Sequence, residues 1–350
     1  MVDGDLRAVA AALGPKCDAL SGSSILVTGA GGFLPSYVVL AVAWMNRNVL
    51  AKPCKILALQ RTAPDAGSRI AAVANDPNVT VLVQSVTDPL PRGVSAQFIV
   101  HAASPASPKA YLARPFDAID ANVWGTRMLL DCAREWQSRS VLFFSSSEPY
   151  GSPPPEQIPT PETYAGQVDP LGVRAPYTET KRMGETLCAT YARAYGVPAR
   201  VVRPFHTYGP AVQLDDGRIM GEFLRQRLNG QAIEAKSDGR GIRSFCYVGD
   251  ATAGFMAALL SDCVGEAFNI GDDREPVTIR QLAHIIAEIE SPHVPVHLAT
   301  APQTGHLTGT PDEVKPDLQK AARMLGYHPQ TSLREGIQRT LRWFREQAPH

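Results

Sequence analysis

Short runs of apolar and β-branched residues alternate with longer amphipathic stretches in the first two thirds of the chain. The short runs lie at 24–28, 55–59, 79–83, 97–103, 141–147 and 200–205. The stretches that fit helices lie at about 34–47, 66–75, 115–136 and 177–196. This alternation is typical of a parallel sheet with helices on both faces, because a parallel crossover needs a long connection. We therefore predict an α/β fold with a doubly wound parallel sheet.

The pattern changes after about residue 204, where strands and helices become shorter and polar turns such as 214–218 and 237–241 appear. We predict that residues 1–203, together with about 247–265, form a Rossmann-like NAD(P)-binding domain. Residues 204–246 and 266–350 are then expected to form a smaller C-terminal α/β substrate lobe. The first 20 or so residues read as an amphipathic helix, which we expect to pack against the sheet edge.

Composition excludes several functional classes. The chain has 34 Lys and Arg against 34 Asp and Glu, so it lacks the positive charge that binding to a nucleic-acid backbone needs. The longest apolar stretch, 37–45, is shorter than the ~18 residues of a membrane-spanning helix. Asp3 and Asp5 stand where a signal peptide carries positive charge, so we expect a cytoplasmic protein without membrane contact. The six cysteines and eight histidines show no ligand spacing, which predicts no metal site.

A glycine-rich turn follows the first apolar run directly and precedes a long apolar helix. The turn runs from Thr28 to Pro35, with glycines at 29, 31 and 32. Glycines allow the backbone to approach a pyrophosphate, whose negative charge a helix N-terminus stabilises. The sequence therefore predicts a dinucleotide site, with Gly29, Gly32, Phe33 and Leu34 beside the coenzyme.

Tyr177 and Lys181 are four residues apart and share one face of a predicted helix. An ammonium beside a phenol lowers the phenol's pKa, which would make Tyr177 a usable base near neutral pH. Upstream, the run at 141–147 ends in Ser145, Ser146, Ser147 and Glu148, at the carboxyl end of a strand. Doubly wound sheets bind their ligands at that edge. These residues predict a catalytic site with Tyr177 at its centre.

The T-G-x-x-G turn and the later Y-x-x-x-K motif resemble the extended short-chain dehydrogenase/reductase family. Within that family the chain is most similar to UDP-glucuronate decarboxylases, from about residue 24 to 340. The segments that carry this similarity are 103–108, 146–148, 172–174, 177–182, 207–210, 216–218 and 243–248. The resemblance implies that Tyr177 is the base, Lys181 its electrostatic partner and Ser146 a hydrogen-bonding hydroxyl, with Ser147 and Glu148 completing the catalytic set.

The same resemblance implies which residues bind the coenzyme. They are Gly29, Gly32, Phe33, Leu34, Arg61, Val86, Ala103, Ser104, Asn122, Tyr177 and Lys181. NAD-binding members carry an acidic residue at the end of the second strand, and here that region reads Ala58-Leu59-Gln60-Arg61. Arg61 is suited to a 2′-phosphate, so we expect NAD and keep NADP as a possibility.

Residues that the resemblance places at the substrate are Ser107, Lys109, Arg174, His206, Arg218 and Arg243. Arg243 and Glu148 are expected at the far end of the sugar, where a guanidinium holds a carboxylate bidentately. Relatives that bind nucleoside diphosphate sugars generally carry Asn in place of His206 and Arg in place of Ala211. The diphosphate is therefore expected to be held with fewer contacts here.

The expected activity is transient oxidation of a sugar hydroxyl to a ketone, followed by decarboxylation of a nucleotide-linked uronic acid. The first alternative is a dehydratase of the 4,6- or 5,6-type that acts on a nucleotide sugar or a nucleoside. A nucleotide-sugar 4-epimerase is the second alternative, and a non-catalytic dinucleotide-binding regulator represents another class. The family also implies a homodimer, through the helices at 115–136 and 177–196.

Overall fold

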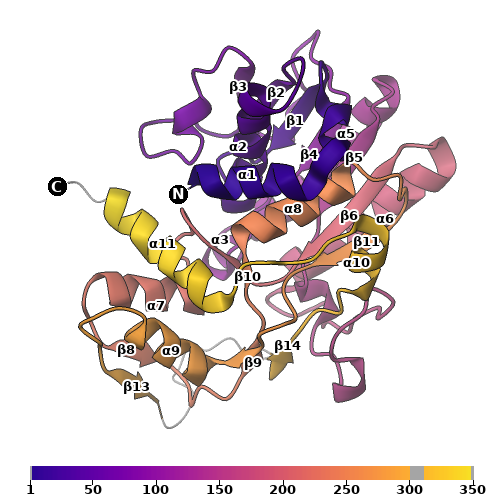
Figure 1. The fold of residues 1–350 in the computed structure, drawn as a ribbon. Coiled ribbons are helices and arrows are strands. Elements are labelled where there is room, and N and C mark those ends of the chain that lie inside the picture. The colour runs from indigo at the N-terminus through magenta and orange to yellow at the C-terminus, as the bar shows by residue number, and fades with distance from the viewer. Residues whose placement is uncertain (1, 300–310, 348–350) are drawn as a thin grey trace.

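The computed structural model describes residues 2–299 and 311–347, and a seven-stranded parallel sheet forms its centre (Figure 1). The strand order is β11-β6-β5-β4-β1-β2-β3. The strands are β1 (Ser24–Thr28), β2 (Lys55–Gln60), β3 (Val79–Val83), β4 (Phe98–His101), β5 (Ser140–Phe144), β6 (Ala199–Pro204) and β11 (Ala267–Ile270). The chain order reverses between β1 and β4, and a crevice for ligands opens at such a point. The predicted doubly wound sheet is confirmed.

Helices cover both faces of this sheet. One layer contains α1 (Val2–Leu13), α2 (Phe33–Asn48), α8 (Val248–Leu259) and α10 (Gln319–Leu325). The other contains α4 (Pro115–Ile119), the π-helical turn η3 (Asp120–Gly125), α5 (Thr126–Glu135) and α6 (Ala175–Tyr195). Side chains of β1 alternate between the layers: Ile25 and Val27 join the core under α2, and Leu26 joins the core under α5. This alternation follows from the two-residue period of a strand.

Two expectations about helices are corrected. Residues 66–75 form turns and the single short helix η2 (Ala71–Val73), because Asp65 accepts a hydrogen bond from the Gly67 N–H and starts a turn there. The first helix, α1, packs on α2 and α8 instead of on the sheet edge. It ends where Gly14 and Pro15 begin the short helix η1 (Gly14–Leu20).

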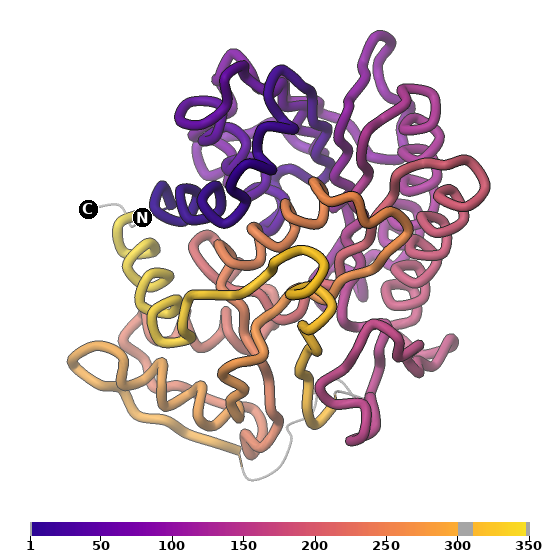
Figure 2. Tube along the Cα trace, turned by 45° about the vertical axis from the view of Figure 1, so that its right-hand side comes forward, coloured from indigo at the N-terminus to yellow at the C-terminus, as the bar shows by residue number. Residues whose placement is uncertain are grey.

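Asp5 of α1 is buried and joins distant parts of the chain. Its carboxylate accepts hydrogen bonds from the Tyr247 hydroxyl at 2.8 Å and from Arg339 at 3.1 Å. Arg339 belongs to the last helix, α11 (Leu333–Gln347), and both views place this helix beside the start of the chain (Figures 1 and 2). Burial raises the pKa of Asp5, and its two partners oppose that shift.

The smaller lobe has a core of its own. Its elements are β7 (Thr207–Tyr208), α7 (Ile219–Leu228), β8 (Ile233–Ala235), β9 (Ile242–Arg243), β10 (Cys246–Tyr247), β12 (Val277–Thr278), α9 (Ile279–Glu288), β13 (Val296–Leu298), β14 (Glu313–Val314) and α11. Phe223, Leu224, Ile286 and Ile337 are fully buried between these elements. The chain returns to the sheet through α8 and β11 (Figure 2), so the returning segment extends to Ile270, beyond the expected 247–265.

Residues 1, 300–310 and 348–350 of the two expected domains lie outside the described residues. Within 2–299 and 311–347, no helix has both the length and the apolar character needed to cross a bilayer. The same residues contain no cluster of potential metal ligands, and the cytoplasmic location stays a prediction.

Candidate active site

The glycine-rich turn lies where β1 and β4 separate. Gly29 has a φ of 70°, and a Cβ there would stand 2.8 Å from Ala103 Cα, so the turn requires glycine at this position. Ala103 follows β4, and its N–H donates to Thr28 Oγ1 at 3.3 Å. Helix α2 begins at Phe33 and Leu34 directly after Gly32, and no described side chain caps its first turn. These residues fit the diphosphate of a dinucleotide, because free N–H groups and close backbone approach suit that anion.

At the end of β2, Arg61 was expected to face a 2′-phosphate of the coenzyme, but its guanidinium contacts a carboxylate of this chain instead. The Arg61 guanidinium forms an ion pair with Asp117 of α4 at 2.9 Å, and Arg114 approaches the same carboxylate at 3.4 Å. Its charge is therefore already partnered. Gln60, the preceding residue, is buried beside the glycine-rich turn.

Tyr177 and Lys181 lie in the first turns of α6, which begins at Ala175. Lys181 Nζ donates to the Phe144 carbonyl at 2.6 Å and stands 5.7 Å from the centroid of the Tyr177 ring. Burial lowers the pKa of Lys181 to about 7, and the charge of Glu185 opposes that shift. The lysine is therefore poised to exchange a proton near neutral pH.

The expected lowering of the Tyr177 pKa is wrong for this arrangement. Burial raises the pKa of the phenol, and the negative charge of Glu148 raises it further. A hydrogen bond with Ser146 and the charge of Arg218 lower it by less. The reason is that a buried phenolate loses its hydration, which the desolvated Lys181 does not replace.

Asn122 lies in η3 and is fully buried against α6. Its amide Nδ2 donates to Thr180 Oγ1 at 3.1 Å, and Thr180 lies between Tyr177 and Lys181 on the helix. Its Oδ1 has no hydrogen-bond partner in the described part of the chain. A π-helical turn often marks a functional position in a helix, and here it directs Asn122 toward the Tyr177 helix. Val86 is buried next to this turn, in contact distance of Gly125.

Ser146, Ser147 and Glu148 follow β5, as expected. Ser146 is buried, and its Oγ accepts a hydrogen bond from the Glu148 N–H at 3.2 Å. Glu148 itself forms an ion pair with Arg174 at 2.7 Å. Both side chains are about one quarter exposed, which leaves them accessible to a ligand.

Tyr111 is a site residue that sequence reasoning missed. It lies on the short helix α3 (Pro108–Ala113), and its hydroxyl donates to Glu148 at 3.5 Å. Its ring stacks on the ring of Tyr177, so it touches both the expected base and the carboxylate. A single tyrosine in a short helix gives no signal in a sequence, because its role depends on residues far along the chain.

Three of the expected substrate residues are arginines whose charges act on a fourth, His206. His206 is surrounded by Arg174, Arg218 and Arg243, whose charges act with burial to lower its pKa to about 3. The imidazole is therefore neutral at physiological pH, and its Nδ1 is buried with no partner among residues 2–299 and 311–347. Two of these guanidinium groups have carboxylate partners, Glu148 for Arg174 at 2.7 Å and Asp216 for Arg218 at 3.5 Å, and Arg243 has none in the described residues.

The arginines differ in how much of their hydrogen-bonding capacity is used. Arg243 donates to the carbonyls of Ile242 at 2.7 Å, Pro311 at 2.8 Å and Asp312 at 3.2 Å. Arg218 donates to the carbonyl of Ala106, in the segment that follows β4. That segment contains Ser104 and ends at Ser107, whose Oγ caps α3 by accepting a hydrogen bond from the Ala110 N–H. The side chain of Lys109 is exposed.

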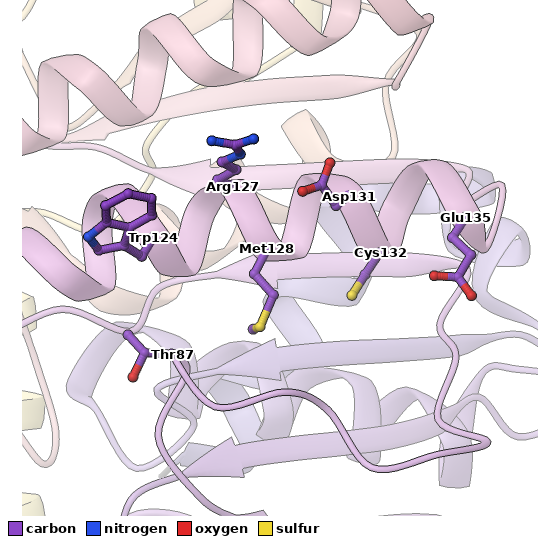
Figure 3. A pocket seen from close by; sticks show the side chains of 7 residues that line it. All are labelled: Thr87, Trp124, Arg127, Met128, Asp131, Cys132 and Glu135. Atoms are coloured by element: carbon purple, nitrogen blue, oxygen red, sulfur yellow. The ribbon is translucent and has the colours of Figure 1, made fainter.

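A shallow depression of about 370 Å³ lies away from these residues, on the outer face of η3 and α5 (Figure 3). Trp124 and Met128 border it together with Arg127 and Asp131, and Thr87 closes it from the neighbouring loop. Trp124 is 58% exposed. This depression is separate from the catalytic residues and belongs to the surface of the helical layer.

Comparisons with known proteins agree with this geometry. The profile of the "NAD dependent epimerase/dehydratase family" matches residues 25–271. UDP-glucuronic acid decarboxylase 6 of Arabidopsis thaliana is 35% identical over 320 residues, which cover 91% of this chain and 87% of that protein.

Solved structures show the same fold. The UDP-glucose 4-epimerase of Thermotoga maritima superposes with a TM-score of 0.76 at 25% identity and covers 92% of this chain and 99% of its own. The dTDP-glucose 4,6-dehydratase DesIV of Streptomyces venezuelae, crystallised with NAD, gives a TM-score of 0.75 at 26% identity, over 93% and 97% of the two chains. The resemblance drawn from the motifs is confirmed: the chain belongs to the NAD dependent epimerase/dehydratase family of extended short-chain dehydrogenases/reductases.

Proposed function

We propose that the chain decarboxylates a nucleotide-linked uronic acid after transient oxidation of the sugar. The observation that carries this proposal is the group of three guanidiniums, Arg174, Arg218 and Arg243, whose charges act on His206. Arg174 is paired with Glu148 and Arg218 with Asp216, whereas Arg243 has no carboxylate partner in the described residues. A uronic acid attached to a nucleoside diphosphate is negatively charged at both ends, and clustered guanidinium groups bind carboxylates and phosphates. The 35% identity to a UDP-glucuronic acid decarboxylase supports the same substrate class.

The chain's own side chains account for the proton movements. Tyr177 accepts the proton of the sugar hydroxyl only as a phenolate, a form that burial and Glu148 disfavour and that the positive charge of a bound oxidised nicotinamide would favour. Ser146 donates a hydrogen bond to the same sugar oxygen. The glycine-rich turn and Lys181 would hold NAD, whose nicotinamide would supply the hydride acceptor and later the hydride donor. The carboxylate β to the ketone then leaves as CO₂, and its bonding electrons move to the ketone oxygen. Tyr177 and Ser146 stabilise the negative charge that develops there.

Glu148 and Arg174 have linked roles in this scheme. The ion pair fixes the direction of the Glu148 carboxylate, because the Arg174 guanidinium holds it at 2.7 Å. Glu148 is then a base or an electrostatic partner on the sugar, and Arg174 positions it. The arginines release the substrate carboxylate when it becomes CO₂, which carries no charge.

A dehydratase is the second candidate, and the hydrogen bonds of Arg243 favour it. Its guanidinium is held by three main-chain carbonyls, which leaves fewer donors for a substrate carboxylate. The chain also has Ala211 where many nucleotide-sugar enzymes carry an arginine for the diphosphate, and a nucleoside substrate would not need that contact. A hexose with a terminal hydroxyl instead of a carboxylate needs no such contact.

The decisive experiment incubates the purified protein and NAD with UDP-glucuronic acid labelled in the carboxyl group. We expect labelled CO₂ and a nucleotide pentose, with the reaction abolished in Tyr177→Phe. Tyr195→Phe is the matched control, because Tyr195 lies on the same helix and is 51% exposed. Loss of water from a nucleotide hexose, without CO₂ from any uronic acid, would establish the dehydratase instead.

The exposed apolar side chains of the helical layer support a homodimer. Phe116, Trp124 and Met183 are 73%, 58% and 46% exposed, and they lie on α4, η3 and α6. Such residues mark a contact surface when they occur together on neighbouring helices. A second copy of this chain is the proposed partner, with the depression beside Trp124 as part of the interface (Figure 3).

A further inference from the structure

Gln60 stands at the end of β2, where a carboxylate would select NAD by binding the 2′-hydroxyl of its adenosine ribose. Only 7% of its surface is exposed. Its Nε2 donates to the Thr62 carbonyl at 2.7 Å, and its Oε1 is buried with no partner in the described residues. A Cβ added to Gly31 would stand 2.8 Å from that Oε1, so the amide faces the glycine-rich turn. An unpartnered buried oxygen at this place indicates a ligand that completes it.

Arg69 brings a positive charge to the same turn from the loop that follows β2. Its Nη1 donates to the Gly31 carbonyl at 3.1 Å, and its Nε donates to the Ala211 carbonyl of the smaller lobe at 2.8 Å. A guanidinium has five N–H donors, and these two bonds use two of them, so three remain.

No carboxylate within the described ranges forms an ion pair with Arg69. Burial lowers its pKa, and the more distant charge of Asp216 opposes that shift. Arg61, by contrast, is neutralised by Asp117 at 2.9 Å. A partly buried guanidinium whose contacts are only carbonyls is suited to bind an anion, because it keeps both charge and free donors.

We propose that Gln60 and Arg69 together form the binding corner for the coenzyme's adenosine ribose and that this corner accepts a 2′-phosphate, so that the chain binds NADP as well as NAD. A carboxylate at position 60 would repel that phosphate, whereas the amide of Gln60 carries no charge. Its Oε1 can accept from a ribose hydroxyl, and its Nε2 keeps one N–H beyond the bond to Thr62 that can donate to an anion. Arg69 supplies the compensating charge. The proposal rests on the dinucleotide site and is independent of which sugar the enzyme converts.

The test measures nucleotide binding by the purified full-length protein, without any sugar. NADH and NADPH are titrated separately, and nicotinamide fluorescence reports the two dissociation constants. We expect the two constants to agree within about tenfold, which corresponds to ~1.4 kcal/mol or less. NADPH binding more than about a hundredfold weaker than NADH binding would overturn the proposal.

Three variants assign the effect to residues. Gln60→Asp should weaken NADPH binding by about tenfold or more and leave NADH binding unchanged or tighter, because a like charge then faces the phosphate. Arg69→Gln should weaken NADPH binding by about tenfold and NADH binding by less than about threefold, since a charged hydrogen bond is lost only with the phosphate. Arg61→Gln is the matched control and should leave the ratio unchanged. A ratio that changes in Arg61→Gln but not in Arg69→Gln contradicts the assignment.

Two further measurements keep the test decisive if Arg69→Gln does not fold. Arg69→Lys retains the charge and should keep NADPH binding within about threefold of the parent, less than the loss expected for Arg69→Gln. In the parent protein, added salt should weaken NADPH binding more steeply than NADH binding, because screening acts on the additional phosphate. Equal salt dependence for both nucleotides counts against the proposal. A protein that binds both nucleotides but converts no uronic acid would refute only the decarboxylase function.

Discussion

Tyr111 and Tyr177 lie face to face, with ring centroids 4.8 Å apart and ring planes inclined by 12°. The stack fixes the plane of the expected base, while the Tyr111 hydroxyl reaches Glu148 at 3.5 Å. Tyr111 therefore contacts both the phenol ring of Tyr177 and the carboxylate of Glu148. Tyr111 is a positioning residue in this arrangement, because it acts through both of its neighbours.

Replacing Tyr111 separates the two contacts. Tyr111→Phe keeps the stack and should retain most of kcat, whereas Tyr111→Leu should lower kcat by about tenfold, since an aromatic pair contributes ~0.5–1.5 kcal/mol. Steady-state kinetics and the pH profile of kcat are the measurements. A merely structural role would lower thermal stability in Tyr111→Leu but leave the pH profile unmoved, and that outcome contradicts the prediction.

Lys181 should make the protein more stable as the pH rises from about 7 to about 10. Burial lowers the pKa of its ammonium to about 7 in the folded chain, whereas the unfolded chain keeps the ordinary value near ~10.4. Between these values the unfolded state binds more protons, so the free energy of unfolding increases with pH by at most ~1.4 kcal/mol per pH unit. Urea unfolding of Lys181→Met across this interval should lack that increase. Lys52→Met, at an exposed position, is the control and should retain it.

His206 should sensitise the fold to acid. Its pKa is lowered to about 3 by burial and by the three neighbouring arginines, so the folded chain keeps it neutral while the unfolded chain takes up a proton near ~6.5. Stability from this residue is complete above the unfolded value and decreases as the pH falls toward 3. His206→Asn should therefore unfold at a lower pH than the parent, as followed by circular dichroism. His293→Asn, at an exposed position, should unfold like the parent.

The proposed dimer is tested at Trp124 and Met183. Introducing Glu at either position places a charge in an apolar contact, which should shift the sedimentation mass from two chains to one. Val264→Glu provides the control, because Val264 is 45% exposed and lies between α8 and β11, on another surface. A parent protein that sediments as a single chain would exclude the interface.

The features that could be predicted from the sequence are those that depend on residues close together in the chain. The run at 24–28 alternates its side chains between two cores as a buried strand must, and the glycines after it permit only a tight turn. The spacing of Tyr177 and Lys181 placed them on one face of a helix. Each of these features depends on neighbours within a few residues.

The parts that escaped prediction depend on contacts between distant segments. Arg61 appeared free in the sequence, and only the fold brings Asp117 to it. The 66–75 segment has helical periodicity, but the turn at Asp65 prevents the helix, and Arg69 then reaches the glycine-rich turn instead. The pKa of Tyr177 follows burial, which periodicity does not measure.

The hydrogen bonds of Asp5 join residues that are synthesised at very different times. Arg339 is 334 positions further along the chain, so the ion pair of Asp5 forms only after Arg339 and all seven strands of the central sheet have been synthesised. Until then a buried carboxylate lacks the cation that compensates it. Helix α11 thus compensates the charge of a residue that α1 has already carried into the core.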